Sequence, residues 1–230
     1  MDKKDQGFVT QADLESERYI IQELKKVMPE AAFFAEESGK TGSGDYCWVI
    51  DPLDGTTNFS FGIANFAISI ALTHNDKPVF GMIFDPVHDE LFWACQGSGA
   101  YVKSKGETKP ISVSGQTDLS KALILLGVPY AKDAQFEYVV SRATEIIKEV
   151  FAFRHLGAAA LDQVLVACGR ADGMFLTNLG WYDVAAGLLI IQEAGGKVST
   201  FEGTEVGPEY KSYVAGNLVI HQKLREHLVL

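Results

Sequence analysis

The first quarter of the chain combines a helical pattern with a short buried run. Apolar side chains recur at helical spacing from about Asp13 to Met28, and Pro29 ends the pattern. Cys47 to Ile50 is an apolar run bounded by a Gly/Ser-rich loop and by Asp51-Pro52. Such a run predicts a buried strand whose carboxyl end enters a turn.

Several strands are expected next. The runs Ala67 to Thr73 and Val79 to Phe84 flank the turn residues Asn75 to Pro78, which predicts a hairpin. Glu90 to Ala94 and Ala100 to Val102 have the same character and are expected to extend its sheet. The first half of the chain is therefore predicted to be rich in β-structure.

Strands and helices alternate in the second half. Ala122 to Leu126 reads as a strand, and a helical pattern runs from about Ala134 to Val150. Two further apolar helices are predicted at Ala158 to Cys168 and at Val184 to Ala194. Gly195-Gly196 follows the last of these as a C-terminal cap.

This order of elements predicts an α/β fold of layered helices and sheets. The chain has 230 residues, enough to bury a substantial core. Because no Pro/Ser-rich linker divides it, we expect one domain over residues 1–230. Two subdomains of about 1–115 and 116–230 are expected to share a cleft.

Composition narrows the class of protein. No run approaches the roughly 18 apolar residues of a membrane helix, and Met1 to Gly7 lacks the apolar core of a secretory signal. We therefore expect a cytoplasmic protein with no membrane partner. Cys47, Cys95 and Cys168 lie far apart among apolar neighbours, which favours reduced thiols.

The formal net charge of -10 would repel phosphate backbones and disfavours nucleic acid as a partner. An anionic substrate is compatible with this charge only if carboxylates converge on divalent cations, which reverse the local field.

The most informative stretch follows the buried strand at Cys47 to Ile50. Asp51 and Asp54 lie three residues apart where that strand ends, so a turn can aim both carboxylates inward. Gly55 allows backbone to approach a ligand, and the amides after it can face an anion if a helix begins at Thr56. An Asx-rich turn explains the same residues equally well. The similar stretch Asp85 to Asp89 is interpreted as such a turn.

Two further acidic positions have ordinary explanations when taken alone. Glu36-Glu37 follows apolar sequence, although acidic pairs usually belong to a solvated face. Asp183 stands at the start of an apolar helix, where capping of free amides is the usual role.

In combination these motifs resemble a known family. The segments concerned are Val9 to Asp13, Ala35 to Ser38, Trp48 to Phe59, Trp181 to Gly187 and Glu193 to Gly196. Together they are similar to the inositol monophosphatase family of lithium-sensitive, magnesium-dependent phosphatases, over nearly the whole chain. The resemblance implies an alternating αβαβα sandwich of the sugar-phosphatase type, a homodimer, and a small phosphorylated substrate.

The resemblance also implies a ligand set. Glu36, Asp51 and the Leu53 carbonyl would bind one Mg²⁺, and Asp51, Asp54 and Asp183 a second, within a total of two or three ions. Hard oxygen ligands of this kind suit magnesium. Two cations can hold the attacking water and the departing oxygen during in-line displacement at phosphorus.

Catalytic and substrate-binding roles follow from the same likeness. Thr56 would contact the nucleophilic water and be oriented by Asp13, with Glu36 nearby. Thr10-x-x-Asp13 is also a helix-capping pattern, so Asp13 has two interpretations. The residues implied to contact the substrate are Asp54, Gly55, Thr56, Gly157, Ala158, Ala159 and Asp183.

The chain departs from the family pattern in two places. The Val9-Thr10 motif comes almost at once, whereas family members usually carry one more helix before it, whose loss would uncover apolar surface. Inositol-specific members carry an acid seven residues before the last metal aspartate, and this chain has Leu176 there. We therefore expect hydrolysis of a small sugar or polyol phosphate by metal-activated water, without a preference for inositol.

Two other functions remain open on the sequence. A nucleotide 3'-phosphatase or a fructose-1,6-bisphosphatase belongs to the same class, but the nucleotide branch more often has lysine after Asp-Gly-Thr, where this chain has Thr57. A pseudo-enzyme that binds metal without turnover is disfavoured, because Glu36, Thr56 and Asp13 are all present.

Overall fold

The structure is a computed structural model that describes residues 9–128 and 134–228. The expectation drawn from Met1 to Gly7 lies outside the described residues. Within them, two β-sheets and a set of helices form a mixed α/β fold, as predicted. No helix in this part of the chain combines the length and apolar character needed to cross a membrane.

The larger sheet has eight strands in the order β2-β1-β3-β4-β5-β6-β7-β8. All neighbours are antiparallel except β1 and β3. The strands are β1 (Ala32–Ala35), β2 (Gly39–Thr41), β3 (Tyr46–Asp54), β4 (Ala67–His74), β5 (Lys77–Asp85), β6 (Glu90–Cys95), β7 (Ala100–Ser104) and β8 (Glu107–Ile111).

The smaller sheet has five strands in the order β10-β9-β11-β13-β12. The first three are parallel, and the last two run antiparallel to their neighbours. The strands are β9 (Leu123–Leu126), β10 (Ala152–Arg154), β11 (Gly173–Thr177), β12 (Lys197–Ser199) and β13 (Ser212–Gly216).

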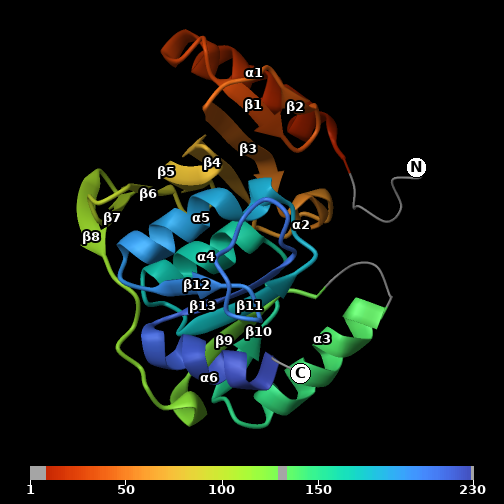
Figure 1. The fold of residues 1–230 in the computed structure, drawn as a ribbon, viewed down its shortest axis with the longest axis vertical. Coiled ribbons are helices and arrows are strands. Elements are labelled where there is room, and N and C mark those ends of the chain that lie inside the picture. Colours follow the sequence, from red (N-terminus) through yellow and green to blue (C-terminus); the bar gives the residue numbers. More distant parts are fainter. Residues whose placement is uncertain (1–8, 129–133, 229–230) are drawn as a thin grey trace.

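Helices separate and cover the two sheets in five layers (Figure 1). The α-helices are α1 (Gln11–Val27), α2 (Thr56–Ser60), α3 (Ala134–Ile147), α4 (Ala159–Ala167), α5 (Trp181–Glu193) and α6 (Leu218–Leu228), and a short 3-10 helix, η2, spans Leu119–Lys121. Helix α1 lies on the outer face of the large sheet, α4 and α5 lie between the sheets, and α3 and α6 cover the small sheet. The order is the predicted αβαβα sandwich.

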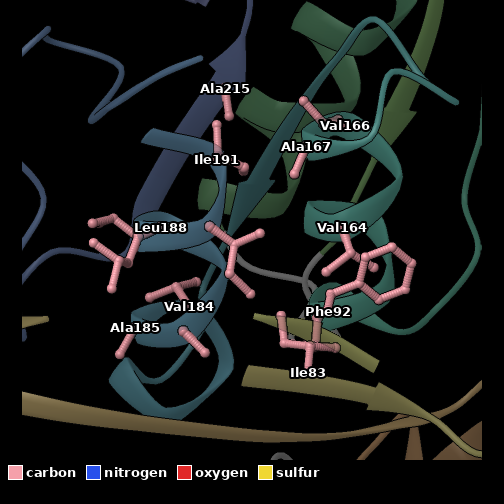
Figure 2. Close-up of a cluster of buried hydrophobic side chains, with 14 of the residues drawn as sticks. Ile83, Phe92, Val164, Val166, Ala167, Val184, Ala185, Leu188, Ile191 and Ala215 are labelled. Carbon is pink, nitrogen blue, oxygen red and sulfur yellow. The ribbon is translucent and has the colours of Figure 1, made fainter. Parts of the chain in front are cut away.

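The largest core cluster fills the space between the sheets. Figure 2 shows Ile83 and Phe92 of the large sheet close to Val164 of α4, with α5 alongside. Helices α4 and α5 are apolar nearly all round because each has a sheet on either side, which explains their lack of a strong amphipathic pattern. Smaller clusters lie under α1 and between the small sheet and α3 and α6.

The predicted elements are confirmed with shifts of a few residues at their ends. Helix α1 starts at Gln11 rather than Asp13, because Thr10 is the N-cap and forms a capping box with Asp13. Strand β3 continues to Asp54, beyond the predicted Ile50. Helix α6 and strands β1, β2, β8 and β10 to β13 were not predicted individually, since short or weakly periodic runs carry little signal.

Close approach between α5 and the large sheet depends on a glycine. A Cβ atom at Gly81 in β5 would lie 2.7 Å from the Ala186 carbonyl oxygen and 2.9 Å from its Cα. Both are backbone atoms of α5, so neither can move without shifting the helix. Gly81 therefore sets the distance between the large sheet and the helix that carries Asp183.

We expect Gly81→Ala to lower the free energy of unfolding by about 1–3 kcal/mol, the usual effect of overpacking a filled core. Denaturant unfolding measures this change. Gly115→Ala is the matched control, because a Cβ there meets nothing within 4 Å and the backbone does not need a positive φ. Equal stability of the two variants would show that the α5 contact is not tight.

Candidate active site

A β-bulge in β3 brings Asp51 and Asp54 to one face of the sheet. In a regular strand, residues three apart point to opposite faces. Asp51 pairs with Ser69 and Asp54 with Ala67, so β3 has one more residue than β4 between these pairs. Pro52 lies in the bulged segment. Proline has no N–H to donate, and a bulge is one of the few places in a sheet where that is tolerated. Both carboxyl groups are buried.

Glu36 lies in the turn directly after β1, the strand parallel to β3. Its amide donates to the Ile50 carbonyl oxygen at 3.1 Å, which places Glu36 beside Asp51. The turn is held from below by Glu17 of α1, whose carboxylate accepts the amides of Glu37 at 2.8 Å and Ser38 at 3.0 Å. A buried acid on α1 thus fixes the backbone that carries Glu36.

Helix α2 begins immediately after the aspartates. Gly55 adopts φ of +87°, a conformation that other residues rarely adopt, and a Cβ there would lie 3.0 Å from the Asn65 carbonyl oxygen. Thr56 Oγ1 lies 3.0 Å from Asp13 Oδ1 and 2.9 Å from the Leu53 carbonyl oxygen.

Asp13 joins the first helix to this turn. Its Oδ2 accepts the Thr10 amide at 2.8 Å in the capping box, while its Oδ1 accepts the Thr56 hydroxyl. The two interpretations of Asp13 are therefore compatible, because each uses a different oxygen.

Helices α4 and α5 complete the site from the other side. Asp54 accepts the amides of Ala159 at 3.1 Å and Ala160 at 2.7 Å, at the N-terminus of α4. Asp183 lies in the first turn of α5, where its carboxylate accepts the Gly180 amide at 2.5 Å. Gln163 links the helices by donating to the carbonyls of Ala159 and Asp183.

Carboxylate oxygens of Asp51, Asp54 and Asp183 lie within 4.8 Å of one another. None of the three forms a salt bridge with a Lys, Arg or His side chain in the described part of the chain. Burial, with the neighbouring negative charges of Glu36 and Asp54, raises the pKa of Asp51 well above its usual range. Burial likewise raises the pKa of Asp183, and the charge of Asp54 adds to the effect.

The pKa values of Glu36 and Asp54 are also raised. Burial raises the pKa of Glu36 to about 7, against a hydrogen bond with Asp51 that lowers it. Burial raises the pKa of Asp54 to about 6, and the amides of Ala160 and Ala159 limit this rise because they stabilise the charged form. The cluster is a set of acids that the fold brings together against their mutual repulsion.

These acids line a cavity of about 430 Å³. Its wall includes all the residues predicted for the site except Asp13: Glu36, Asp51, Leu53, Asp54, Gly55, Thr56, Gly157, Ala158, Ala159 and Asp183. Asp13 does not line the cavity, but its carboxylate accepts a hydrogen bond from the hydroxyl of Thr56, which does. Leu176 also lines the cavity, with a buried side chain.

Sequence reasoning missed several residues that support the site. Glu17 follows Asp13 by four residues and so shares its helix face, a signal that was available. Asn58 donates to the carbonyls of Asn65 and Leu156 at 2.8 Å each, tying α2 to the segment before Gly157. Nothing in the local pattern indicates this long-range pair or the role of Gln163.

Comparison with known proteins agrees with this fold and site. The family model described as the inositol monophosphatase family matches residues 1–229. The chain is 40% identical over 219 residues to an inositol-1-monophosphatase of Mesorhizobium japonicum, covering 94% of this chain and 81% of that protein.

Two solved structures are similarly close. The extragenic suppressor protein suhB from Bartonella henselae superimposes with a TM-score of 0.90 at 40% identity, covering 96% of this chain and 84% of that one. An inositol monophosphatase from Anabaena (Nostoc) sp. PCC 7120 gives 0.87 at 37% identity, with coverage of 98% and 89%.

The family model and the relatives named inositol-1-monophosphatase identify the chain as a phosphoric monoester hydrolase. More narrowly, the chain belongs to the inositol monophosphatase family, which is metal-dependent.

The donor set fits a divalent metal ion. Asp51 and Asp54 are buried and Asp183 is half-buried, and none of the three has a cationic side-chain partner among the described residues. The resulting concentration of negative charge is one that hard cations satisfy. The described cavity wall contains no cysteine, and its one histidine, His155, is not part of the acidic cluster. Soft-metal sites are therefore a poor match.

Because the carboxylates repel one another, we expect Asp183→Asn to stabilise the protein in chelator by about 1 kcal/mol. The same variant should lose most of the rise in melting temperature that Mg²⁺ gives the unaltered protein. Thermal unfolding with EDTA and with added Mg²⁺ measures both changes.

Asp172→Asn serves as the control. Its carboxylate accepts the Leu123 amide and the Ser114 hydroxyl, so the substitution should lower stability in both conditions. If Asp183→Asn destabilised the chelated protein as much as Asp172→Asn, repulsion would not dominate the cluster.

Proposed function

We propose that this protein hydrolyses a small phosphomonoester, a sugar or polyol phosphate, in a reaction that requires Mg²⁺. The observation that carries the proposal is the convergence of Asp51, Asp54 and Asp183 in the wall of the cavity, where no described lysine, arginine or histidine pairs with them. The elements that carry them come from opposite sides of the cavity, so the site can hold a phosphate between the large sheet and the helices.

The metal ligands in this proposal are Glu36, Asp51, Asp54, Asp183 and the Leu53 carbonyl. Bound magnesium supplies positive charge that offsets the phosphate and activates water for attack. Burial raises the pKa values of both Glu36 and Asp51, which favours a proton on the cluster when no cation neutralises it.

Thr56 and Asp13 orient the attacking water. The Thr56 hydroxyl has one proton and two acceptors within 3.0 Å, Asp13 Oδ1 and the Leu53 carbonyl oxygen. Once the Leu53 oxygen is a metal ligand, the carboxylate of Asp13 is the stronger acceptor. The lone pairs of Thr56 Oγ1 can then accept a hydrogen bond from water, and Glu36, which lines the same cavity, can receive a proton.

The phosphate is assigned to the turn at Gly55 and Thr56. The Gly55 amide also donates a hydrogen bond to Asp54, so it can bind the phosphate only if it gives up that bond. Gly157, Ala158 and Ala159 form a small-residue wall for the organic part of the substrate. The Ala159 amide is already bound to Asp54, so this wall contacts the substrate through its surface rather than through that donor.

Leu176 bears on the choice of substrate. A leucine cannot accept the hydroxyl hydrogen bonds that an acid at this position would accept. The loss of one such bond costs about 1.5–3 kcal/mol, or roughly ten- to a hundredfold in selectivity. We therefore expect inositol 1-phosphate to be no better a substrate than other small phosphomonoesters.

A phosphate-release assay tests the proposal on inositol 1-phosphate, glycerol 2-phosphate, a hexose phosphate and an adenosine monophosphate. We expect turnover of several of these with Mg²⁺, none in excess EDTA, and inhibition by Ca²⁺, whose larger and looser shell misplaces the water. Full activity in EDTA would falsify the magnesium requirement. A preference for inositol 1-phosphate above a hundredfold would show that Leu176 has no such effect.

Two variants separate metal binding from water orientation. We expect Asp183→Asn to weaken metal binding and to recover part of its activity at high Mg²⁺. Thr56→Ala should lower turnover by roughly 10²- to 10⁴-fold without such recovery, because it removes a positioned hydrogen-bonding group. Magnesium titration of kcat for both variants decides. Recovery of Thr56→Ala to the unaltered rate would exclude Thr56 from orienting the water.

The family likeness supports three further parts of the proposal. They are inhibition by lithium, a cytoplasmic location and a homodimeric state.

A further inference from the structure

The cavity wall has charge of opposite sign in two places. Its acids include the cluster of Glu36, Asp51, Asp54 and Asp183. Lys211 is the one lysine or arginine among the described residues of the wall. It precedes β13, whereas Asp51 and Asp54 come from the large sheet, so the ammonium group and the acids reach the cavity from different layers.

The backbone around Lys211 is fixed. Strand β13 pairs with β11 through Ser212 and Thr177, and the Asn178 amide donates to the Lys211 carbonyl oxygen at 2.7 Å. Lys211 Nζ donates to the Leu179 carbonyl oxygen at 3.1 Å. An ammonium group has three donors, so this bond holds Lys211 at the loop before α5 and leaves donors for a ligand.

The cavity wall at β11 and the loop after it includes the apolar side chains of Leu176 and Leu179. Leu176 is buried, and its side chain fills the space where a Cβ at Gly127 would lie, only 2.6 Å from Leu176 Cδ2. His155, also in the wall, lies 2.7 Å through Nδ1 from the Leu126 carbonyl oxygen. A carbonyl only accepts, so Nδ1 carries the proton. The cavity wall therefore offers a cationic donor from Lys211 and no carboxylate at residue 176.

From this arrangement we infer that the preferred substrate carries a second anionic group, a carboxylate or a phosphate, which Lys211 binds while the scissile phosphate lies at the acidic cluster. The inference rests on the proposed phosphatase function and makes it narrower. An anion at Lys211 gains a charge-assisted hydrogen bond in a chain whose net charge of -10 otherwise repels it. Lys211 is a specificity residue and takes no part in bond breaking.

Matched substrate pairs test the inference. Glycerol 2-phosphate and 2-phosphoglycerate differ by a carboxylate, and fructose 1-phosphate and fructose 1,6-bisphosphate differ by a phosphate. We expect kcat/KM to favour the more anionic member of at least one pair by about tenfold, through KM, in line with one partly exposed charged hydrogen bond. The pair that shows the preference identifies the group bound.

Lys211→Met removes the charge and keeps an apolar side chain. It should abolish the preference, while kcat/KM for the less anionic substrate stays within about twofold of the unaltered protein. Lys211→Arg should retain it, and Lys211→Glu should reverse it. Lys223→Met is the matched control, since Lys223 also donates to a single backbone carbonyl, that of Thr117, but lies outside the cavity wall.

The inference is overturned if Lys211→Met changes both members of each pair equally, or changes neither. The inference and the proposed function fail in different ways. If glycerol 2-phosphate is hydrolysed with Mg²⁺ but Lys211→Met does not discriminate, only the inference is wrong. If no substrate releases phosphate, the proposed function is wrong and the inference falls with it.

Discussion

Repulsion among closely spaced carboxylates is the constraint that the rest of this structure has to offset. Asp51, Asp54, Asp183 and Glu36 are held close together, and no described lysine, arginine or histidine pairs with them, an arrangement that the isolated peptide segments would avoid. The fold compensates with neutral donors, above all the amides at the start of α4 and the Gly180 amide before α5. Oriented amides stabilise negative charge without neutralising it, so the cluster keeps its affinity for cations.

The layered architecture makes this arrangement possible. Asp51 and Asp54 come from a strand of the large sheet, and Asp183 comes from a helix between the sheets. Their separation depends on how closely α5 approaches the large sheet, and Gly81 removes the atom that would hold the two apart. At Gly187, the next residue of α5 after Ala186, a Cβ would meet the Gln163 side chain, so α4 and α5 are also in close contact. The close packing of α5 therefore also fixes the position of Asp183 relative to Asp51 and Asp54.

The sequence predicted the elements with strong periodicity, such as α1 and the β4–β5 hairpin, and the resemblance supplied the acidic residues. The sequence pattern could not predict the bulge that turns Asp51 and Asp54 to one face, since a bulge is defined by the pairing with the partner strand. Nor could it supply Lys211, whose position depends on the register between β11 and β13. Glu17 is an intermediate case, because helical spacing places it beside Asp13 but the amides it accepts lie 20 and 21 residues away.

The shared carboxylate of Asp13 links local helix stability to the geometry of the cavity. One oxygen closes the first turn of α1, and the other holds the Thr56 hydroxyl. Helix ends open locally at lower free energy than the core. When the first turn of α1 unwinds, Thr56 loses its carboxylate partner although the acidic cluster remains in place. Heating should thus break the hydrogen bond between Thr56 and Asp13 before the sheets separate. The temperature at which this bond is lost is set by the stability of the first turn of α1 rather than by that of the whole fold.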